Sequence, residues 1–280
     1  MKRLKIDFDH ELTRGIGSYN ESLGIWWYSR ACNASHTRAY RRIAGYLRAS
    51  VPGSPRLIID YACGSGNLLS RLGVLFPDSR LMGLDGSKYL LSLARRRLRH
   101  SKGCLEKRVR LIETALPRFD FPRVKADLVV FAFPNLVLSD KLRLRPYSGN
   151  PDLEGARSLA RAVNAEEGDG AGGSVSDLFS LLLGRLVSFN LRALLKRGGL
   201  CFRVEYTRAQ RDELSEAQLM RSEFEEGSLN TRIDGRLPRQ WFRVLASSYI
   251  RSRVIEDVDQ QSGKKGGMPG GYLITVLRAL

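Results

Sequence analysis

Short apolar runs alternate along the chain with segments that carry apolar residues on one helical face. Four of these runs have the length and composition of buried strands, and they cover residues 57–61, 80–85, 109–113 and 126–133. Segments with one apolar helical face, such as residues 87–99, lie between them. Because strands that alternate with helices build parallel sheets with right-handed crossovers, the pattern predicts a doubly wound α/β domain.

The second half of the chain predicts further elements of the same sheet. A strongly apolar helix is expected to end at residues 196–199, where Lys-Arg meets the helix dipole and Gly-Gly supplies a left-handed cap, and a fifth strand follows at residues 200–206. Pro238 is expected to open a helix with Trp241, Val244 and Leu245 on one face. Two final β-rich runs at residues 248–258 and 272–277 predict an antiparallel hairpin, which completes a mostly parallel seven-stranded sheet.

Two segments lie outside this alternation. Residues 33–49 predict an amphipathic helix, preceded by the aromatic run Trp26-Trp27-Tyr28. Residues 139–176 are irregular and rich in glycine, which is typical of an insertion after the fourth strand. We therefore expect an N-terminal helical lid at residues 1–54 and one domain at residues 55–280 that contains the insertion.

The chain is strongly basic, with a formal net charge of +17, and 36 of its 46 basic residues are arginine. The arginines are scattered, apart from the run at residues 95–99, so the charge favours a solvated basic surface and leaves contact with nucleic acid as an alternative.

The cysteines Cys32, Cys63, Cys104 and Cys201 form no C-x-x-C pair, and no cluster has metal-ligand spacing, so we expect neither a disulfide framework nor a metal site. The N-terminus lacks the apolar stretch of a signal peptide, and the most apolar later segment is interrupted by charges. These features predict a cytoplasmic protein that does not enter the membrane.

The segment with the most chemical information is residues 58–68, in which a strand enters a turn of small residues and then a helix. Small residues let backbone amides approach a ligand, and the helix presents its positive end to it. Asp85 ends the next strand about 19 residues after Gly66, where a carboxylate can accept both hydroxyls of a ribose. Leu69 occupies the position at which a dinucleotide fingerprint that starts at Gly64 needs glycine, which argues against NAD.

This segment resembles the first motif, D-x-G-x-G-x-G, of the class I S-adenosylmethionine (SAM)-dependent methyltransferases. Asp60, Gly64 and Gly66 match it, and Ala62 replaces the first glycine of the motif. The resemblance runs from about residue 55 to the end. It implies that SAM is the cofactor and S-adenosylhomocysteine (SAH) its product.

The resemblance also implies which residues bind SAM. Asp60 and the turn from Ala62 to Gly66 would face its amino-acid portion, and Asp85 would bind the ribose. The positions that would lie around the adenine and the rest of the cofactor are Gly86, Ser87, Glu113 or Thr114, and Phe131.

The acceptor side is less defined. In this family the acceptor lies beyond the fourth strand, where residues 133–136 do not match the motif of the methyltransferases that act on base amines. Asn135 is a candidate to hydrogen-bond the acceptor, and Glu205 is a candidate to orient or deprotonate it. His10, His36 and His100 fall outside the sheet motifs and are weak candidates for catalysis.

Three functions remain open at this stage. We expect an enzyme that methylates a small molecule or a modified peptide, with RNA as the alternative acceptor because of the charge. A SAM-fold protein that only binds is the third hypothesis, because Ala62 and the sequence after Phe133 depart from the family pattern. The sequence leaves the oligomeric state open.

Overall fold

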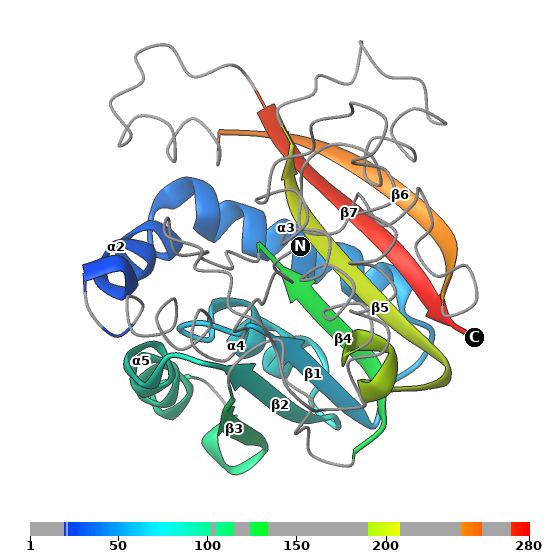
Figure 1. The fold of residues 1–280 in the computed structure, drawn as a ribbon, viewed down its shortest axis with the longest axis horizontal. Helices are drawn as coiled ribbons and strands as arrows, with labels where there is room; N and C mark the ends of the chain where they lie inside the picture. Colours follow the sequence, from blue (N-terminus) through cyan, green and yellow to red (C-terminus); the bar gives the residue numbers. More distant parts are fainter. Residues whose placement is uncertain are drawn as a thin grey trace, which may run out of the picture.

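A seven-stranded sheet runs through the part of the chain described by the computed structural model, which comprises residues 20, 22–101, 105–114, 124–133, 190–207, 242–253 and 270–280 (Figure 1). Its strand order is β3-β2-β1-β4-β5-β7-β6. The strands are β1 (Leu57–Tyr61), β2 (Arg80–Asp85), β3 (Val109–Glu113), β4 (Ala126–Ala132), β5 (Leu195–Thr207), β6 (Phe242–Ser252) and β7 (Gly270–Ala279).

The first five strands pair in parallel, and β7 pairs antiparallel with both β5 and β6. The mostly parallel sheet with a terminal antiparallel hairpin is therefore confirmed. The strand order reverses at β1, because β2 and β3 lie on one side of it and β4 and β5 on the other. In open α/β sheets, ligands bind at the carboxyl ends of the strands beside such a reversal.

The helices are α2 (Ser22–Ala31), α3 (Ala34–Ser50), α4 (Asn67–Leu75) and α5 (Lys88–Arg99), with a 3-10 turn, η1 (Leu105–Lys107). The helices α3 and α5 each follow a polar N-cap residue. Asn33 Oδ1 accepts a hydrogen bond from the His36 amide at 2.9 Å, and Ser87 Oγ accepts one from the Leu90 amide at 3.1 Å. Both are N-cap bonds, which satisfy amides that a helix leaves unpaired in its first turn.

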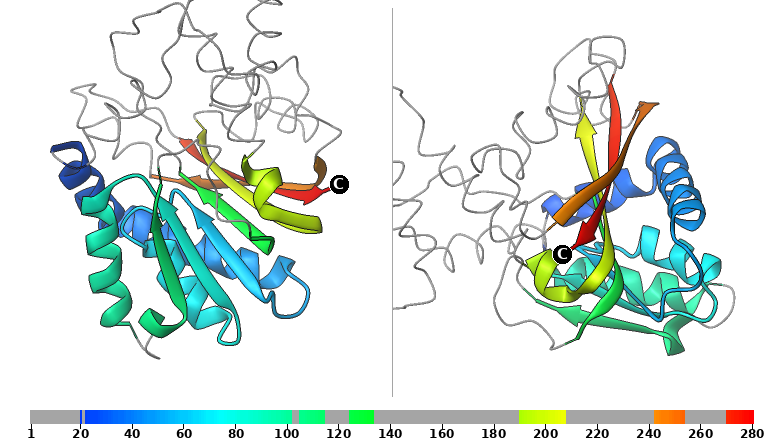
Figure 2. Two further views of the ribbon diagram at one scale, coloured as in Figure 1. Left: turned by 60° about the horizontal axis from the view of Figure 1, so that its bottom comes forward. Right: turned by 90° about the vertical axis from the view of Figure 1, so that its right-hand side faces the viewer.

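The sheet is covered on both faces. Buried residues of α3, α4 and α5 pack on one face with alternate residues of the strands, such as Ile58 and Val130. The other face holds Ile59, Val129 and the short helical stretch at residues 190–194 (Figure 2). This alternation within each strand explains why the strands read as continuous apolar runs, since both of their faces are buried.

Two of the predicted elements were wrong. Residues 242–252 form β6, whereas a helix was expected to include Val244 and Leu245. Their spacing suits a helical face, but pairing with β7 over the whole length of β6 determines the structure. The helix before β5 ends at Leu194 and not at residues 196–199, which are part of β5. Gly198 does adopt the expected left-handed conformation, with φ of 77°.

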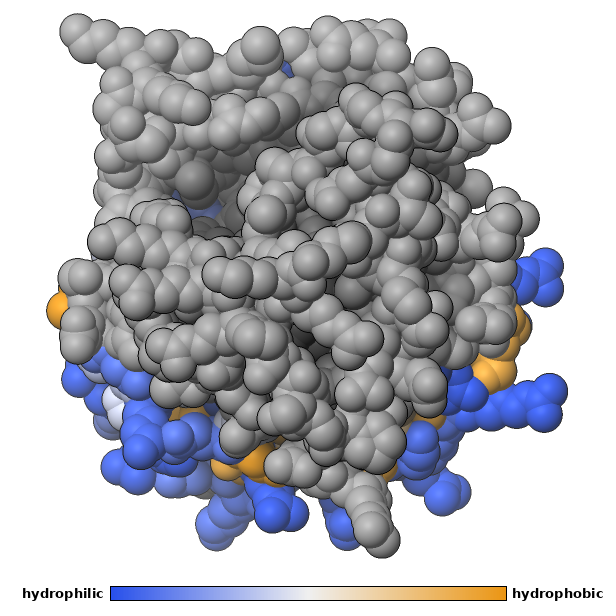
Figure 3. Space-filling model, in the orientation of Figure 1, coloured by the Kyte–Doolittle hydropathy of each residue, from blue (hydrophilic) through white to orange (hydrophobic). Residues whose placement is uncertain are grey.

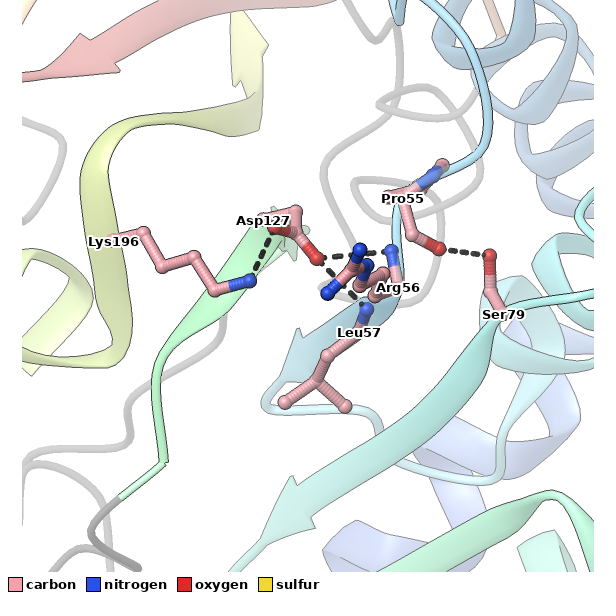
Figure 4. Close-up of polar contacts among 6 residues, drawn as sticks. All are labelled: Pro55, Arg56, Leu57, Ser79, Asp127 and Lys196. Carbon is pink, nitrogen blue, oxygen red and sulfur yellow. Dashed lines mark hydrogen bonds and ion pairs between the residues drawn. The ribbon is translucent and has the colours of Figure 1, made fainter.

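A polar cluster joins three strands at the amino end of the sheet (Figure 4). Asp127 Oδ2 in β4 accepts hydrogen bonds from the amides of Arg56 and Leu57 at 2.9 and 3.0 Å, and Asp127 Oδ1 accepts one from Lys196 Nζ at 2.6 Å. Ser79 donates to the Pro55 carbonyl and links the start of β2 to the same place. Asp127 therefore fixes the starts of β1 and β5 relative to β4, opposite to the edge at which ligands bind.

The Asp127→Asn variant is expected to be less stable by about 1 kcal/mol, because an amide can accept at only one of these two oxygens. Partial burial raises the pKa of Asp127, but the bonds from Lys196 and the two amides outweigh it and hold the pKa below its ordinary value. The carboxylate therefore stabilises the fold above about pH 4 and ceases to do so as the pH falls further. Urea unfolding should give a larger difference at pH 7 than at pH 3, and the exposed Asp78→Asn serves as control.

The surface formed by the described residues is largely hydrophilic. Where these residues are visible in Figure 3, hydrophilic side chains dominate and hydrophobic ones form small separate spots. The large apolar side chains exposed among them are Ile25, Val74, Leu245 and Leu280, which lie on different elements. None of the helices described is long and apolar enough to cross a membrane.

Candidate functional site

The turn that follows β1 has a backbone conformation that residues other than glycine rarely adopt. Ala62, Gly64 and Gly66 have φ angles of 63°, 50° and 73°, all in the left-handed region. A Cβ on Gly66 would lie 3.1 Å from the Cβ of Ala94, whereas a Cβ on Gly64 would meet no atom within 4 Å. The space beside Gly64 is therefore open, and a ligand can approach its backbone.

Two buried carboxyl groups flank this turn. Asp60 is in β1 and Asp85 ends β2, and they are 3% and 9% exposed. Asp85 Oδ2 accepts a hydrogen bond from the Gly64 amide at 2.7 Å, and its Oδ1 accepts one from the Ser87 amide at 2.9 Å. Asp85 thus connects the turn after β1 to the start of α5. Each of its oxygens keeps a lone pair, so it can still accept hydrogen bonds from a ligand.

Burial raises the pKa of both groups, and the charge of Asp85 adds to the rise of the Asp60 pKa. Burial, followed by the charge of Asp85, raises the pKa of Asp60 to about 8, although the Leu69 amide partly offsets this. Burial also raises the pKa of Asp85, and the amides of Ser87 and Gly64 oppose the rise. Two carboxyl groups whose negative charges are poorly compensated favour a ligand that brings a positive charge or hydroxyl donors.

The N-terminal helices lie directly against the turn. Asn67 Nδ2, at the start of α4, donates to the Ala31 carbonyl at 3.1 Å at the end of α2. Arg97 of α5 donates to the Ser65 carbonyl at 3.0 Å, and its guanidinium also lies 3.5 Å from Cys32 Sγ. Residues 31 and 32, at the end of α2, therefore border the candidate site, and the N-terminal lid stays a prediction.

An aromatic cluster closes the same edge of the sheet further along, at the end of β4. The ring of Phe133 lies 5.9 Å from that of His36 and 5.7 Å from that of Tyr40, both edge-on, between centroids. Phe133 has a φ of 51°, and its amide donates to the Val204 carbonyl at 2.8 Å. The pKa of Tyr40 is raised, first by burial and then by the charge of Asp60.

The structure brings most of the predicted cofactor residues together. Asp60, Asp85 and the turn meet at one edge, and Gly86 and Ser87 follow directly on Asp85. The Thr114 amide donates to the Asp85 carbonyl at 2.9 Å, and the Thr114 side chain is buried. Glu113 is instead half exposed, with its Oε1 3.7 Å from Lys88 Nζ.

Other predicted residues lie elsewhere or are not described. Phe131 is fully buried against Tyr61, with 5.2 Å between ring centroids, in the core on the sheet face opposite to Asp60. Asn135 and His10 lie outside the described residues, as do Cys104 and the whole predicted insertion at residues 139–176. The backbone of Glu205 is in β5, but its side chain is not described.

Sequence reasoning missed the contribution of α3. His36 was a weak candidate because it lies outside the sheet motifs, and Tyr40 lies in the amphipathic helix predicted at residues 33–49. The structure buries His36 and places both rings against Phe133. An apolar helical stripe that includes His and Tyr was the available signal, but it did not indicate which end of the sheet the helix covers.

The Ala62→Gly variant is expected to stabilise the ligand-free protein by about 0.5–1 kcal/mol, because glycine adopts a left-handed φ without the steric cost that alanine has. Urea unfolding measures this difference. Ala44→Gly, in the interior of α3, is the matched control and should destabilise by about 1 kcal/mol. Equal destabilisation by both changes would contradict the left-handed conformation of Ala62.

Neither a metal cluster nor a reactive thiol stands out at this edge. Among the described residues, no group of three or more His, Cys, Asp or Glu side chains is placed to hold a metal ion. Cys63 is buried beside the carboxyl groups, and burial, Asp85 and Asp60 raise the pKa of its thiol well above the ordinary value. The site therefore contains carboxyl groups, backbone amides and aromatic rings.

The known sequences that this chain resembles are those of methyltransferases. A family model described as a methyltransferase domain matches residues 58–145. Trans-aconitate 2-methyltransferase of Methylobacterium radiotolerans is 47% identical over 58 residues, which is 20% of this chain and 22% of that protein. The protein of the same name from Yersinia pestis is 45% identical over 71 residues, which is 25% of this chain and 26% of that protein. Each match thus spans about a quarter of the relative's length.

Solved structures share the whole fold. The N-methyltransferase NodS of Bradyrhizobium japonicum, in complex with SAH, aligns with a TM-score of 0.52 at 12% identity and covers 96% of this chain and 98% of that one. Magnesium protoporphyrin IX methyltransferase of Synechocystis, with bound SAH, gives 0.53 at 11% identity, with 95% and 99% covered. The [4+2]-cyclase SpnF gives 0.54 at 14% identity, with 88% and 84% covered. At these identities, the likeness establishes the fold.

Proposed function

We propose that the chain is a class I SAM-dependent methyltransferase that transfers a methyl group from SAM to a small-molecule acceptor, because a methyltransferase-domain model matches residues 58–145 and the chain shares its fold with an N-methyltransferase in complex with SAH. One observation carries this proposal. Two buried carboxyl groups, Asp60 and Asp85, flank an open left-handed turn at the strand end where the sheet order reverses.

The residues at this edge fit the parts of SAM. Asp85 accepts the ribose hydroxyls with the lone pairs that the Gly64 and Ser87 amides leave free. Asp60 and the turn face the amino-acid portion, where a positively charged ammonium group compensates the buried carboxylate. Gly86 and Ser87 border the adenine. Of the two β3 candidates, we favour Thr114 because it is buried and bonded to Asp85, while Glu113 pairs with Lys88 at the surface.

The chemistry needs alignment more than acid–base catalysis. When bound, SAM would supply a methyl group on a sulfonium sulfur; an acceptor atom would attack the methyl carbon in line, and the sulfur would leave as the neutral thioether of SAH. This chain contributes by holding the donor at Asp60 and Asp85 and by excluding water with α2, α3 and the rings of Tyr40 and Phe133. We keep Asn135 and Glu205 as candidates to orient the acceptor.

A small-molecule acceptor is favoured over RNA. The curated relatives are named for methylation of trans-aconitate, which is a small acid. Two arginines of the run that suggested RNA contact have partners within the protein, because Arg97 bonds to Ser65 and Arg99 pairs with Glu106. RNA, a modified peptide and a binding role without catalysis are outcomes that the experiment below separates. The cytoplasmic location stays a prediction.

The test uses the purified protein with isotope-labelled SAM. Calorimetric titration with SAM and with SAH comes first, and we expect both to bind. The protein and the labelled SAM are then incubated in separate reactions with trans-aconitate, with a pool of small carboxylic acids, and with total RNA and protein from cell extract. Label in a small acid supports the proposal, and label in RNA or protein replaces the acceptor class. Binding of SAM with no label in any fraction would favour the binding role.

A further inference from the structure

Tyr272 has a buried hydroxyl group that the fold does not use. It lies near the start of β7, opposite Tyr206 of β5, so the antiparallel pairing places it at the carboxyl end of β5. Its side chain is fully buried, and its oxygen has no hydrogen-bond partner in the part of the chain that the structure describes. Buried polar groups in folded proteins are nearly always paired, so a donor of this kind needs an explanation.

The position of Tyr272 connects it to the candidate site. Its ring lies 5.5 Å from that of Phe133, between centroids, at an angle of 86°. Phe133 in turn contacts Tyr40, which is close enough to Asp60 for that carboxylate to affect its pKa. Tyr272 is thus two aromatic rings away from the group that we assign to the amino-acid portion of SAM, on the side of β4 and β5 where the acceptor is expected.

The chemistry around the hydroxyl indicates what it binds. Burial raises the pKa of Tyr272 to about 12, so the group stays a neutral O–H donor at physiological pH. Arg42, on the exposed side of α3, is near enough for its positive charge to oppose this rise. A hydrogen-bond donor beside a cation selects an oxygen that carries negative charge.

We propose that the Tyr272 hydroxyl donates a hydrogen bond to a carboxylate oxygen of the methyl acceptor and so positions the acceptor beside the donor. This inference rests on the proposed function and adds the residue and the chemical class of the acceptor. The acceptor is a small carboxylic acid.

The experiment compares Tyr272→Phe with Tyr46→Phe in the full-length protein. Tyr46 is a suitable control because its hydroxyl lies 3.1 Å from Ser248 Oγ, outside the site. Trans-aconitate is titrated into each SAH-saturated protein. We expect its Kd to rise about tenfold in Tyr272→Phe and to stay unchanged in Tyr46→Phe, while the SAH affinity stays within about twofold in both.

The urea midpoint of unfolding is a second measurement, and it would fall in Tyr272→Phe if the hydroxyl served only the structure. Without ligand, Tyr272→Phe should keep or raise the urea midpoint, because it removes an unpaired buried group, whereas Tyr46→Phe should lower it. A lower midpoint for Tyr272→Phe, or equal trans-aconitate binding by this variant and the wild type, would overturn the inference. No trans-aconitate binding by a wild-type protein that binds SAH would overturn it while the SAM-binding function stands. Failure of the wild type to bind SAH would overturn both.

Discussion

Replacing Asp60 with asparagine is expected to stabilise the ligand-free protein at alkaline pH and to weaken cofactor binding. The unfolded chain ionises Asp60 near its ordinary pKa of 3.8, whereas the folded protein holds the proton up to about pH 8. The folded state therefore binds more protons between these values, and stability falls as the pH rises through this window. An amide has no charge to bury, so the variant escapes this loss.

The size of the effect makes it measurable by urea unfolding. At about pH 8.5, where the full cost is present, we expect Asp60→Asn to be more stable than the wild type by about 2 kcal/mol or more, and the difference should shrink towards pH 4.5. Asp78→Asn, at an exposed position, should show no such trend. Equal stability of Asp60→Asn and wild type at both pH values would contradict the cost of burying Asp60.

The same variant tests the assignment of Asp60 to the ammonium group of SAM. Removal of one partner from a buried charge pair weakens binding by about 2–5 kcal/mol, which corresponds to at least about thirtyfold in Kd. Titration with SAH measures this loss. A variant that is more stable and also binds SAH as well as the wild type would show that the carboxylate serves neither the fold nor the cofactor.

The first part of the sheet could be predicted closely from the sequence. The bounds of β1, β2 and β3 match the predicted runs, because each is a short apolar strand enclosed by residues that break structure, such as Pro55 before β1 and Gly86 after β2. The spacing of Asp60 and Asp85 then placed both at one edge, since the carboxyl ends of neighbouring parallel strands meet there.

The later elements and the aromatic part of the site could not be predicted in this way. The residues of β6 have a spacing that also suits a helix, and only pairing with β7 decides between the two. Tyr272 reaches Phe133 because β7 pairs antiparallel with β5 in one register. The contact between Tyr272 and Phe133 joins residues that are 139 positions apart (272 − 133), and no local pattern encodes it.

Replacing Asp85 with asparagine is expected to cause the opposite change in stability together with the loss of cofactor. In the folded protein, each carboxylate oxygen accepts a backbone amide, from Gly64 and from Ser87. An asparagine can accept only one of these bonds and turns its NH₂ group towards the other amide. We expect a loss of about 1–3 kcal/mol of stability, measured by urea unfolding, and at least about a hundredfold weaker SAH binding. Glu113→Gln, which removes only an exposed ion pair, should change stability by less than about 0.5 kcal/mol.

The double variant separates the two carboxyl groups energetically. Because the charge of Asp85 contributes to the raised pKa of Asp60, removing Asp85 lowers the cost of ionising Asp60. The gain in stability from Asp60→Asn at about pH 8.5 should therefore be smaller in the Asp85→Asn background than in the wild type. Groups in direct electrostatic contact give such non-additive changes, whereas independent groups give additive ones. Strict additivity would mean that Asp60 is protonated through burial alone and that its repulsion by Asp85 is negligible.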